Sequence, residues 1–409
     1  MKTNSIFTLL LITLLLTACD KSNFEKEPTT IDLDEKSAEI VESNNQFGFD
    51  FFSEVLENET ANKNIMVSPL SVSQALSMAL NGAQENTFTE MQDVLAFAGM
   101  PLNDINTSNQ KIVNALIDHD SKVELKIANS VWYRNDFSPK ADFISNNATY
   151  YNAEVNAYDS SKPEDAKNAM NNWVDKNTKG KIKEIIDQVN PSDIMFLINA
   201  VYFKAEWKTK FEKKETTKKT FTLDNGIEKE VETMIGEVEL SYYNDEHFSV
   251  IKLPYGYGKF DMVIYLPEKD YTTTDIVSEI ENTDFEQLKE STLVKRDLWL
   301  PKFEFSYSKK LNNDLIAMGM NDAFDPNNAN FKSISDIDLF ISSVNHKSYI
   351  KTNEEGTEAA AATSVTFDLT SVGPEGIIKI NRSFLFAIVE EDTNSILFIG
   401  RVYDPTLSE

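Results

Sequence analysis

The chain has 409 residues, of which 41% are apolar, so it can bury a large core and is too apolar to be a disordered protein. Its formal net charge of -27 argues against nucleic acid as a partner, because so acidic a protein repels phosphate. The single cysteine excludes an intramolecular disulfide, so the core alone must hold the fold together.

The first residues have the pattern of an export signal. Lys2 precedes the apolar run Ile6–Leu16, which is too short to span a membrane and suits a secretory signal. The next residues complete Leu16-Thr17-Ala18-Cys19, which resembles a bacterial lipobox. This resemblance implies a lipoprotein signal peptide over residues 1–18 and lipidation of Cys19. The alternative is a plain signal peptide with a chance cysteine. We therefore expect an exported protein, lipid-anchored to a bacterial membrane at its periplasmic face or at the cell surface.

The anchor is expected to lead into a tether and then a folded domain. Residues 19–45 are rich in charged and small polar residues, which predicts the lipidated cysteine followed by a flexible, solvated tether. No long linker interrupts the chain after about residue 46, so we expect one large domain over residues 46–409. At its start, Phe47, Phe51 and Val55 recur at helical spacing, and Pro69 marks a helix that follows a short strand.

Later segments have the pattern of strands more often than of helices. Apolar and polar residues alternate at 123–132, 248–253, 262–266, 298–305, 384–390 and 396–400, and a helix is expected around 166–178. The run 195–203 is apolar on both faces, which predicts a central strand covered above and below. Helices early and strands late favour an α+β fold with large, mostly antiparallel sheets.

The stretch 354–373 is the most informative part of the sequence. Its four consecutive alanines have high helix propensity, so an ordinary exposed helix is one interpretation. From Thr357 onward, however, one alternating set of side chains is uncharged, and the other contains both acids, Glu358 and Asp368. This period of two predicts a strand with Thr357 facing inward and Glu358 facing outward. Because glycines flank the stretch as they flank an exposed loop, it can leave a loop and enter a sheet.

The run Glu354–Ala361 resembles the hinge of the reactive loop in inhibitory serpins, the serine protease inhibitor family. Other residues match the family in order over roughly residues 46 to 405, among them Asn64, Ser68, Pro69, Ser71, Gly82, Trp173, Thr178, Gly180, Asn199, Trp207, Tyr255, Lys302, His346, Phe384, Gly400 and Pro405. The resemblance implies an α+β serpin fold with about nine helices and three β-sheets, metastable, with an exposed reactive loop at about residues 354–376.

The resemblance also implies roles for individual residues, in three groups. The hinge comprises Glu355, Gly356, Thr357, Glu358, Ala359, Ala360, Ala361 and Ala362. A hydrogen-bonded shutter beneath the point where the main sheet parts comprises Ser68, Ser71, Asn199 and His346. A breach at the top of the opening comprises Trp207 and the ion pair of Lys302 with Glu354. The alternatives are an ordinary core histidine at position 346 and two separately solvated charges at the breach.

The position of the reactive bond depends on which end of the loop is used for counting. Family spacing from Gly356 places it between Thr370 and Ser371, whereas counting back from Phe384 places it after Val372; Leu369 is a further alternative. We prefer the count from the hinge, because the inserted segment needs a fixed length. No Lys or Arg lies between residues 358 and 378, which favours elastase-like or chymotrypsin-like targets over trypsin-like ones.

The resemblance implies an irreversible suicide-substrate inhibitor of serine proteases, with cysteine proteases as a further class, that traps the acyl-enzyme by inserting its loop into the main sheet. The alternative is a non-inhibitory serpin that acts as a surface binding module. An enzyme is not expected, because the chain has no Gly-x-Ser-x-Gly motif and no thiol besides Cys19. Its three histidines lack metal-ligand spacing, so neither a metal nor a cofactor is expected. The expected partners are the target protease, bound covalently, and the membrane, bound through the lipid; the protein itself is expected to be a monomer.

Overall fold

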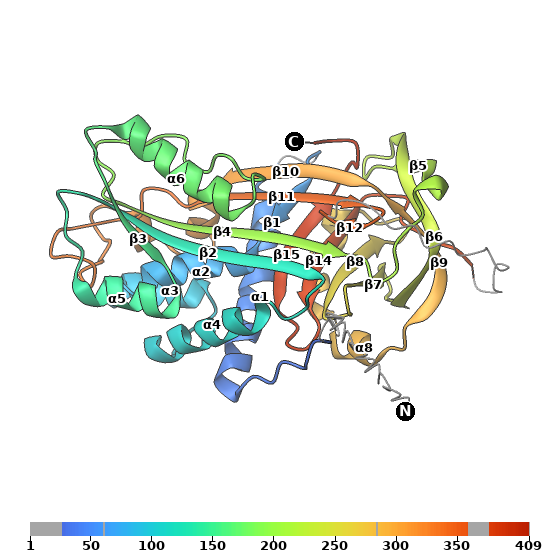
Figure 1. Ribbon diagram of the computed structural model, residues 1–409, viewed down its shortest axis with the longest axis horizontal. Helices are drawn as coiled ribbons and strands as arrows, with labels where there is room; N and C mark the ends of the chain where they lie inside the picture. Colours follow the sequence, from blue (N-terminus) through green and yellow to red (C-terminus); the bar gives the residue numbers. More distant parts are fainter. Residues whose placement is uncertain (1–26, 60–61, 284, 359–375, 409) are drawn as a thin grey trace, which may run out of the picture.

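The structure is a computed structural model, and it describes residues 27–59, 62–283, 285–358 and 376–408. Figure 1 shows α1 to α5 gathered on one side of the long strands β2 and β4, with α6 on the other side. Helices α2 and α6 both contact β4, so this strand is covered on both faces as its apolar sequence predicts. Helices on an extended antiparallel framework make this an α+β fold.

Nine α-helices lie within the described residues: α1 (Glu35–Glu57), α2 (Pro69–Leu80), α3 (Glu85–Val94), α4 (Leu102–Leu116), α5 (Ala141–Tyr150), α6 (Pro163–Asn177), α7 (Thr273–Ile276), α8 (Phe285–Glu290) and α9 (Asn312–Ala317). The same residues form short 3-10 helices at η1 (Lys213–Glu215), η2 (Ile280–Asn282) and η3 (Asp322–Phe324). The strands are β1 (Ile65–Val67), β2 (Val123–Arg134), β3 (Glu154–Tyr158), β4 (Met195–Glu206), β5 (Thr217–Thr222), β6 (Glu228–Asn244), β7 (Phe248–Tyr255), β8 (Phe260–Pro267), β9 (Val294–Pro301), β10 (Phe303–Lys310), β11 (Asn345–Asn353), β12 (Gly356–Thr357), β13 (Ile378–Lys379), β14 (Phe384–Glu390) and β15 (Ile396–Val402).

The strands form two hydrogen-bonded networks. A six-stranded sheet has the order β10-β11-β12-β4-β2-β3, and a nine-stranded sheet has the order β1-β15-β14-β8-β7-β6-β9-β13, with β5 paired to β6. The three sheets implied by the sequence appear as two networks because the 17-residue β6 belongs to two ladders, one with β7 and one with β9. Between the strands of the described residues, pairing is antiparallel except for β2 with β3 and β9 with β13, in agreement with the expected mostly antiparallel fold.

The folded region begins before the predicted domain boundary. Helix α1 starts at Glu35, and the side chain of Asp34 caps it by accepting a hydrogen bond from the amide of Ser37 at 3.1 Å. The prediction of a flexible tether up to residue 45 is therefore wrong for residues 35–45. Its polar composition concealed a helical stripe, since Ile40 and Val41 are buried in the core in phase with Phe47.

A second difference concerns the alternating run 298–305, which sequence analysis treated as one strand. It forms the end of β9 and the start of β10, which belong to different sheets. Lys302 lies between them, and its side chain turns to the breach described below. Each strand buries alternate side chains, which are Leu298 and Leu300 in β9 and Phe303 and Phe305 in β10. The run therefore resembles one strand, although the buried position shifts by one residue at the break.

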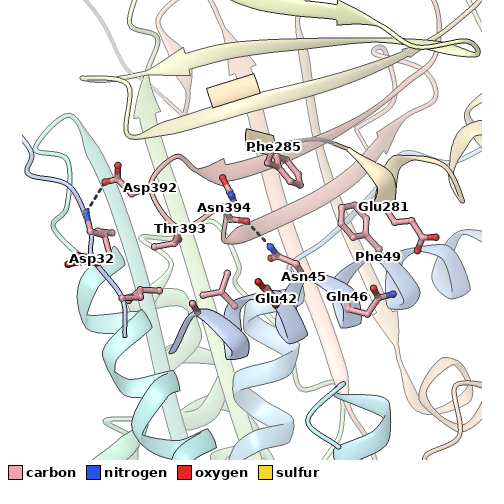
Figure 2. A pocket seen from close by; sticks show the side chains of 14 residues that line it. Asp32, Glu42, Asn45, Gln46, Phe49, Glu281, Phe285, Asp392, Thr393 and Asn394 are labelled. Carbon is pink, nitrogen blue, oxygen red and sulfur yellow. Dashed lines mark hydrogen bonds between the residues drawn. The ribbon is translucent and has the colours of Figure 1, made fainter. Parts of the chain in front are cut away.

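The segment before α1 is held against the turn between β14 and β15. The amide of Ile31 donates a hydrogen bond to Asp392 at 2.9 Å, and Asn45 donates to the carbonyl of Asn394 at 2.8 Å. Figure 2 shows these contacts around a hollow of about 500 Å³ between α1 and the turn. Among the described residues no helix is long and apolar enough to cross the bilayer, and the expected signal peptide and Cys19 lie outside them.

Candidate functional site

The first residues of the predicted hinge already lie inside the six-stranded sheet. Strand β12 lies between β11 and β4 (Figure 1), and Thr357 pairs with Thr352 of β11 and Ala205 of β4. Within the described residues, β11 and β4 pair with β12 but not with each other. The hinge therefore enters the sheet at one end of an opening whose two borders are β11 and β4.

Thr357 points into the core, as the alternation predicts. Its side chain is 2% exposed, and its Oγ1 lies 2.6 Å from the hydroxyl of Tyr255 on β7. The ring of Tyr255 stacks on Trp207, with ring centroids 4.5 Å apart and an angle of 6° between the ring planes. Burial raises the pKa of Tyr255, so its hydroxyl stays protonated at neutral pH and can share a proton with Thr357. These contacts provide a pocket that fits a small hydroxyl side chain.

Gly356 is required by the close approach of β4. Its φ is +147°, and a Cβ atom at this position would lie 2.0 Å from the carbonyl oxygen of Ala205, a distance that real atoms do not reach. The absence of a side chain therefore allows the hinge to cross the end of β4 and place Thr357 in register.

The three breach residues lie together beside the hinge. The Nζ of Lys302 lies 3.0 Å from Oε1 of Glu354, which also accepts a hydrogen bond from Thr216 at 2.8 Å. Burial raises the pKa of Glu354, but bonds to its own backbone amide, Lys302 and Thr216 lower the pKa by more, so the net shift is downward. The indole nitrogen of Trp207 donates to the carbonyl of Asn353 at 2.9 Å. The structure therefore contains the expected ion pair and places it at the entrance of the hinge.

The shutter residues are only partly joined by hydrogen bonds. The hydroxyl of Ser71 donates to Oδ1 of Asn199, and that of Ser68 donates to the carbonyl of Leu397 at 2.7 Å. His346 lies on β11 and makes no hydrogen bond through Nε2 to any described residue. Burial lowers its pKa to about 4, so the ring is neutral at pH 7. The expected four-residue cluster is therefore incomplete, because β11 and β4 do not pair where His346 would meet Asn199.

With this geometry described, comparison with known proteins identifies the family. The family model described as Serpin (serine protease inhibitor) matches residues 42–405. The chain belongs to the serpin family. It is 32% identical to an uncharacterized serpin-like protein of Methanosarcina mazei, over 97% of this chain and 96% of the relative. It is 35% identical to the leukocyte elastase inhibitor of Xenopus tropicalis, over 88% of this chain and 97% of the relative. The solved structure of tengpin, a thermophilic serpin in its native state, aligns with a TM-score of 0.81 at 33% identity, over 92% of this chain and 96% of tengpin.

One hinge residue of this serpin is in an unexpected environment. Glu358 faces away from Tyr255, as the alternation predicts, but it is 8% exposed and its φ is +57°. The Nζ of Lys181, just after α6, lies 3.3 Å from its Oε1. Sequence analysis missed Lys181, because it is far from Glu358 in the chain. The outward face of the strand also does not indicate that another segment packs over it.

Other residues at the site were also missed. Asn129 of β2 is uncharged and belongs to no recognised motif. Its Oδ1 nevertheless accepts a hydrogen bond from Asn199 at 2.7 Å. A signal was available, since Asn129 occupies the inward position of an alternating strand whose other inward residues are apolar. Thr216 had no such signal. The hinge residues Ala359–Ala362 and the reactive-bond candidates Leu369, Thr370, Ser371 and Val372 lie outside the described residues.

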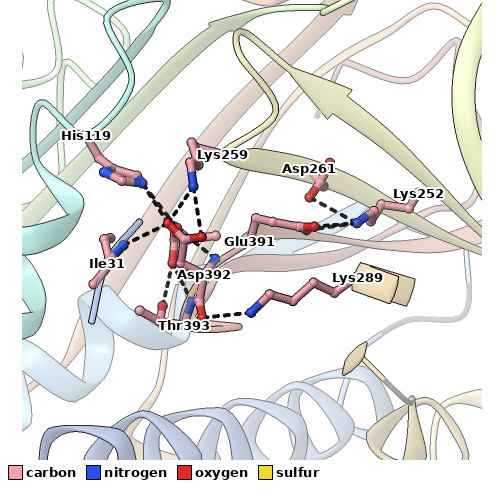
Figure 3. Close-up of polar contacts among 10 residues, drawn as sticks. Ile31, His119, Lys252, Lys259, Asp261, Lys289, Glu391, Asp392 and Thr393 are labelled. Carbon is pink, nitrogen blue, oxygen red and sulfur yellow. Dashed lines mark hydrogen bonds and ion pairs between the residues drawn. The ribbon is translucent and has the colours of Figure 1, made fainter. Parts of the chain in front are cut away.

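A second polar cluster, which we name the turn cluster, surrounds the β14–β15 turn (Figure 3) and consists of His119, Lys252, Lys259, Asp261, Glu390, Glu391 and Asp392. His119, Glu390 and Asp392 offer ligand atoms within 4.8 Å of one another. The Nζ of Lys259 lies 2.9 Å from both carboxylate oxygens of Asp392, so a cation of the protein itself already pairs with one of these acids. This arrangement stabilises the turn and does not favour a metal ion.

Proposed function

We propose that this serpin is an irreversible suicide-substrate inhibitor of serine proteases. The observation that carries the proposal is the position of Thr357, which is in register between β11 and β4 at the end of an opening where no described strand pairs them. A non-inhibitory loop has no need of a small, seated hydroxyl residue followed by alanines. A loop that must enter the sheet has this need at every second position.

The proposed reaction begins as ordinary proteolysis. The protease serine attacks the carbonyl carbon of the residue before the reactive bond, for which we propose Thr370, and the amine of Ser371 leaves with a proton. An ester then links the two proteins, and water would normally hydrolyse it. The freed loop instead extends β12 along the opening between β11 and β4 and carries the protease with it. The ester survives because displacement deforms the catalytic site of the protease before water attacks.

The edges of the opening supply the driving force. The edge of β11 over residues 345–350 and that of β4 over residues 195–204 have no described strand between them. Each new ladder hydrogen bond contributes on the order of 1 kcal/mol net, and each buried apolar side chain adds roughly 1.5 to 3 kcal/mol. A dozen such bonds give on the order of 10 kcal/mol, which is enough to distort one catalytic site.

We propose an elastase-like or chymotrypsin-like target. The loop has no Lys or Arg between residues 358 and 378, and the candidate residues before the reactive bond are Thr370, Leu369 and Val372. The relative in Xenopus tropicalis is named a leukocyte elastase inhibitor, which supports the same class. A trypsin-like protease has a buried acid in its specificity pocket, and this loop offers no basic residue to pair with it.

We also propose that the protein is exported and lipid-anchored through Cys19, because Leu16-Thr17-Ala18-Cys19 resembles a lipobox after a short apolar run. Detergent phase partitioning of cell extracts tests this. The parent chain is expected in the detergent phase and the Cys19→Ser variant in the aqueous phase. Equal partitioning of the two would contradict lipidation.

Incubation with an elastase-like, a chymotrypsin-like and a trypsin-like protease, followed by a denaturing gel, tests the function. We expect a band that survives boiling in detergent, near the combined mass of inhibitor and protease, with the first two enzymes. Active-site-blocked protease is the control and should give no such band. If every protease, mixed with an equal amount of inhibitor, gives cleaved fragments alone, the proposal is wrong and a non-inhibitory binding module is favoured.

A further inference from the structure

The turn that ends α6 lies next to the opening and is tied to the helix by hydrogen bonds. Lys179 and Gly180 have φ of +53° and +81°, and this left-handed pair ends the helix. The hydroxyl of Thr178 accepts a hydrogen bond from the amide of Ile182 at 3.0 Å and ties the next segment back to the helix end. The side chain of Lys181 therefore extends from a backbone segment that is held to the end of α6.

Two lysines of this turn reach different strands of the six-stranded sheet. The Nζ of Lys179 lies 2.6 Å from a carboxylate oxygen of Glu124 on β2. The Nζ of Lys181 lies 3.3 Å from Oε1 of Glu358 and 4.9 Å from the ring centroid of Tyr349 on β11. The turn thus spans the sheet from β2 to β11, and only Lys181 contacts the hinge.

Glu358 is the point at which the hinge leaves the sheet. Its amide donates to the carbonyl of Lys351 at 2.7 Å, but its left-handed φ ends β12 at Thr357. Its side chain is 2% exposed, and neither carboxylate oxygen has a hydrogen-bonding partner among the described residues. Lys181 is the cation paired with it, so the seated hinge depends on that charge.

We propose that Lys181 is a positioning residue for the hinge: its ammonium group holds the Glu358 carboxylate and so keeps Thr357 seated between β11 and β4 before the loop is cut. This inference rests on the proposed inhibitory function. Loop insertion must be faster than hydrolysis of the acyl-enzyme. A hinge that is already in register between β11 and β4 removes the step in which the hinge first enters the sheet. Without Lys181, insertion has to begin from a hinge that spends part of its time outside the sheet.

The electrostatics of the seat predict an asymmetry between the two partners. Burial raises the pKa of Glu358, and Lys181, Tyr202 and Lys204, which face it, only partly offset this shift. Burial and Glu304 raise the pKa of Tyr349 on β11, and the nearby Glu358 carboxylate raises it further. Removing Lys181 therefore leaves a buried charge without its main partner, whereas Glu358→Gln removes the charge that needed one.

Hydrogen exchange of the uncleaved protein tests the seat without any protease. In Lys181→Met, amides of the peptide that spans residues 351–358 should exchange about fivefold faster, the change expected when an ion pair of this size is lost from a local opening equilibrium. Lys181→Arg should exchange like the parent, and so should the matched control Lys179→Met. In the Glu358→Gln background, Lys181→Met should have no effect. Unchanged exchange in Lys181→Met, or an equal effect of Lys181→Met in both backgrounds, would overturn the proposal.

The stoichiometry of inhibition tests the consequence. Lys181→Met should need about fivefold more inhibitor per trapped protease, while the rate of loop cleavage stays the same and Lys181→Arg restores the parental value. If complexes form equally well with Lys181→Met, the positioning role is wrong and the inhibitory function stands. If the parent traps no protease but the exchange pattern holds, the seat stands and the inhibitory function fails.

Discussion

Two polar regions of this serpin bury charges in opposite ways. In the turn cluster no described polar side chain is left without a partner: Lys252 lies 2.8 and 2.9 Å from the two carboxylate oxygens of Glu391, and Glu390 accepts bonds from the amides of Asp392 and Thr393. At the opening, by contrast, polar atoms of three buried side chains have no hydrogen-bonding partner among the described residues, although one of these side chains, Glu358, forms the ion pair with Lys181. These residues are His346 and Thr352 on β11 and Glu358 beside β12.

The difference distinguishes a region whose polar groups are all paired from one that can still rearrange. Buried polar groups that are all paired make a region rigid, whereas unpaired ones cost free energy that a later rearrangement can recover. The turn cluster holds the N-terminal segment against the nine-stranded sheet through the bond from the amide of Ile31 to Asp392. The opening retains one such unpaired atom, Nε2 of His346, on the edge of β11 that the loop would meet.

The largest expected effect follows from blocking the opening with Thr357→Arg. The seat beside Tyr255 fits a hydroxyl group, and an unpaired guanidinium resists burial by several kcal/mol. The variant should be cut at the parental bond, but the covalent complex should fall at least about tenfold on a denaturing gel. Thr357→Ser is the matched control and should trap protease like the parent. Full trapping by Thr357→Arg would show that insertion does not pass this seat.

Breaking the turn cluster should affect stability alone. Lys252 is 6% exposed, so Lys252→Met leaves the buried Asp261 and the partly buried Glu391 without their cation and should lower the free energy of unfolding by about 3 to 5 kcal/mol. The exposed pair of Lys140 with Asp336 provides the control, because Lys140→Met should cost about 1 kcal/mol or less. Urea unfolding measures both. A loss of trapping without a loss of stability in Lys252→Met would contradict the contrast between the two regions.

The buried histidine at the opening should make the protein sensitive to acid. Burial lowers the pKa of His346 from 6.5 to about 4, so between these values the unfolded chain binds a proton that the folded one does not. The stability from this residue is complete above pH 6.5 and is lost as the pH falls toward 4, by about 3 kcal/mol in total. His346→Asn should remove this part of the pH dependence of urea unfolding. Parallel curves for parent and variant would contradict a neutral, buried ring.

A smaller change, Gly356→Ala, should loosen the hinge without unfolding the domain. The added Cβ would meet the carbonyl oxygen of Ala205, so the hinge must leave its register at a cost of about 1 to 3 kcal/mol. Gly236→Ala in β6 is the control, because its Cβ would make only an ordinary contact of 3.4 Å with Phe211. Hydrogen exchange at residues 351–358 should rise in the first variant only. If both variants exchange like the parent, the crossing at Gly356 is not tight.

Sequence patterns predicted the framework of the molecule well where one residue period dominates a long segment. The run 195–203 became β4, the helix around 166–178 became α6, and the inward position of Thr357 followed from alternation alone. Sequence patterns failed where polar residues are buried, because composition shows whether a residue is polar but not whether another part of the protein packs over it. The polar composition of residues 35–45 predicts a tether although they begin α1, and the sequence around Glu358 does not indicate that Lys181 lies over it.

The central claim is that the opening between β11 and β4 accepts the cut loop as a new strand, and thermal unfolding before and after cleavage tests it most directly. A dozen new ladder bonds at about 1 kcal/mol each should raise the melting temperature of the cleaved parent by more than about 15 °C. Cleaved Thr357→Arg should show little of this rise, since its loop is blocked at the first seated position. Equal melting temperatures for intact and cleaved parent protein would contradict the account.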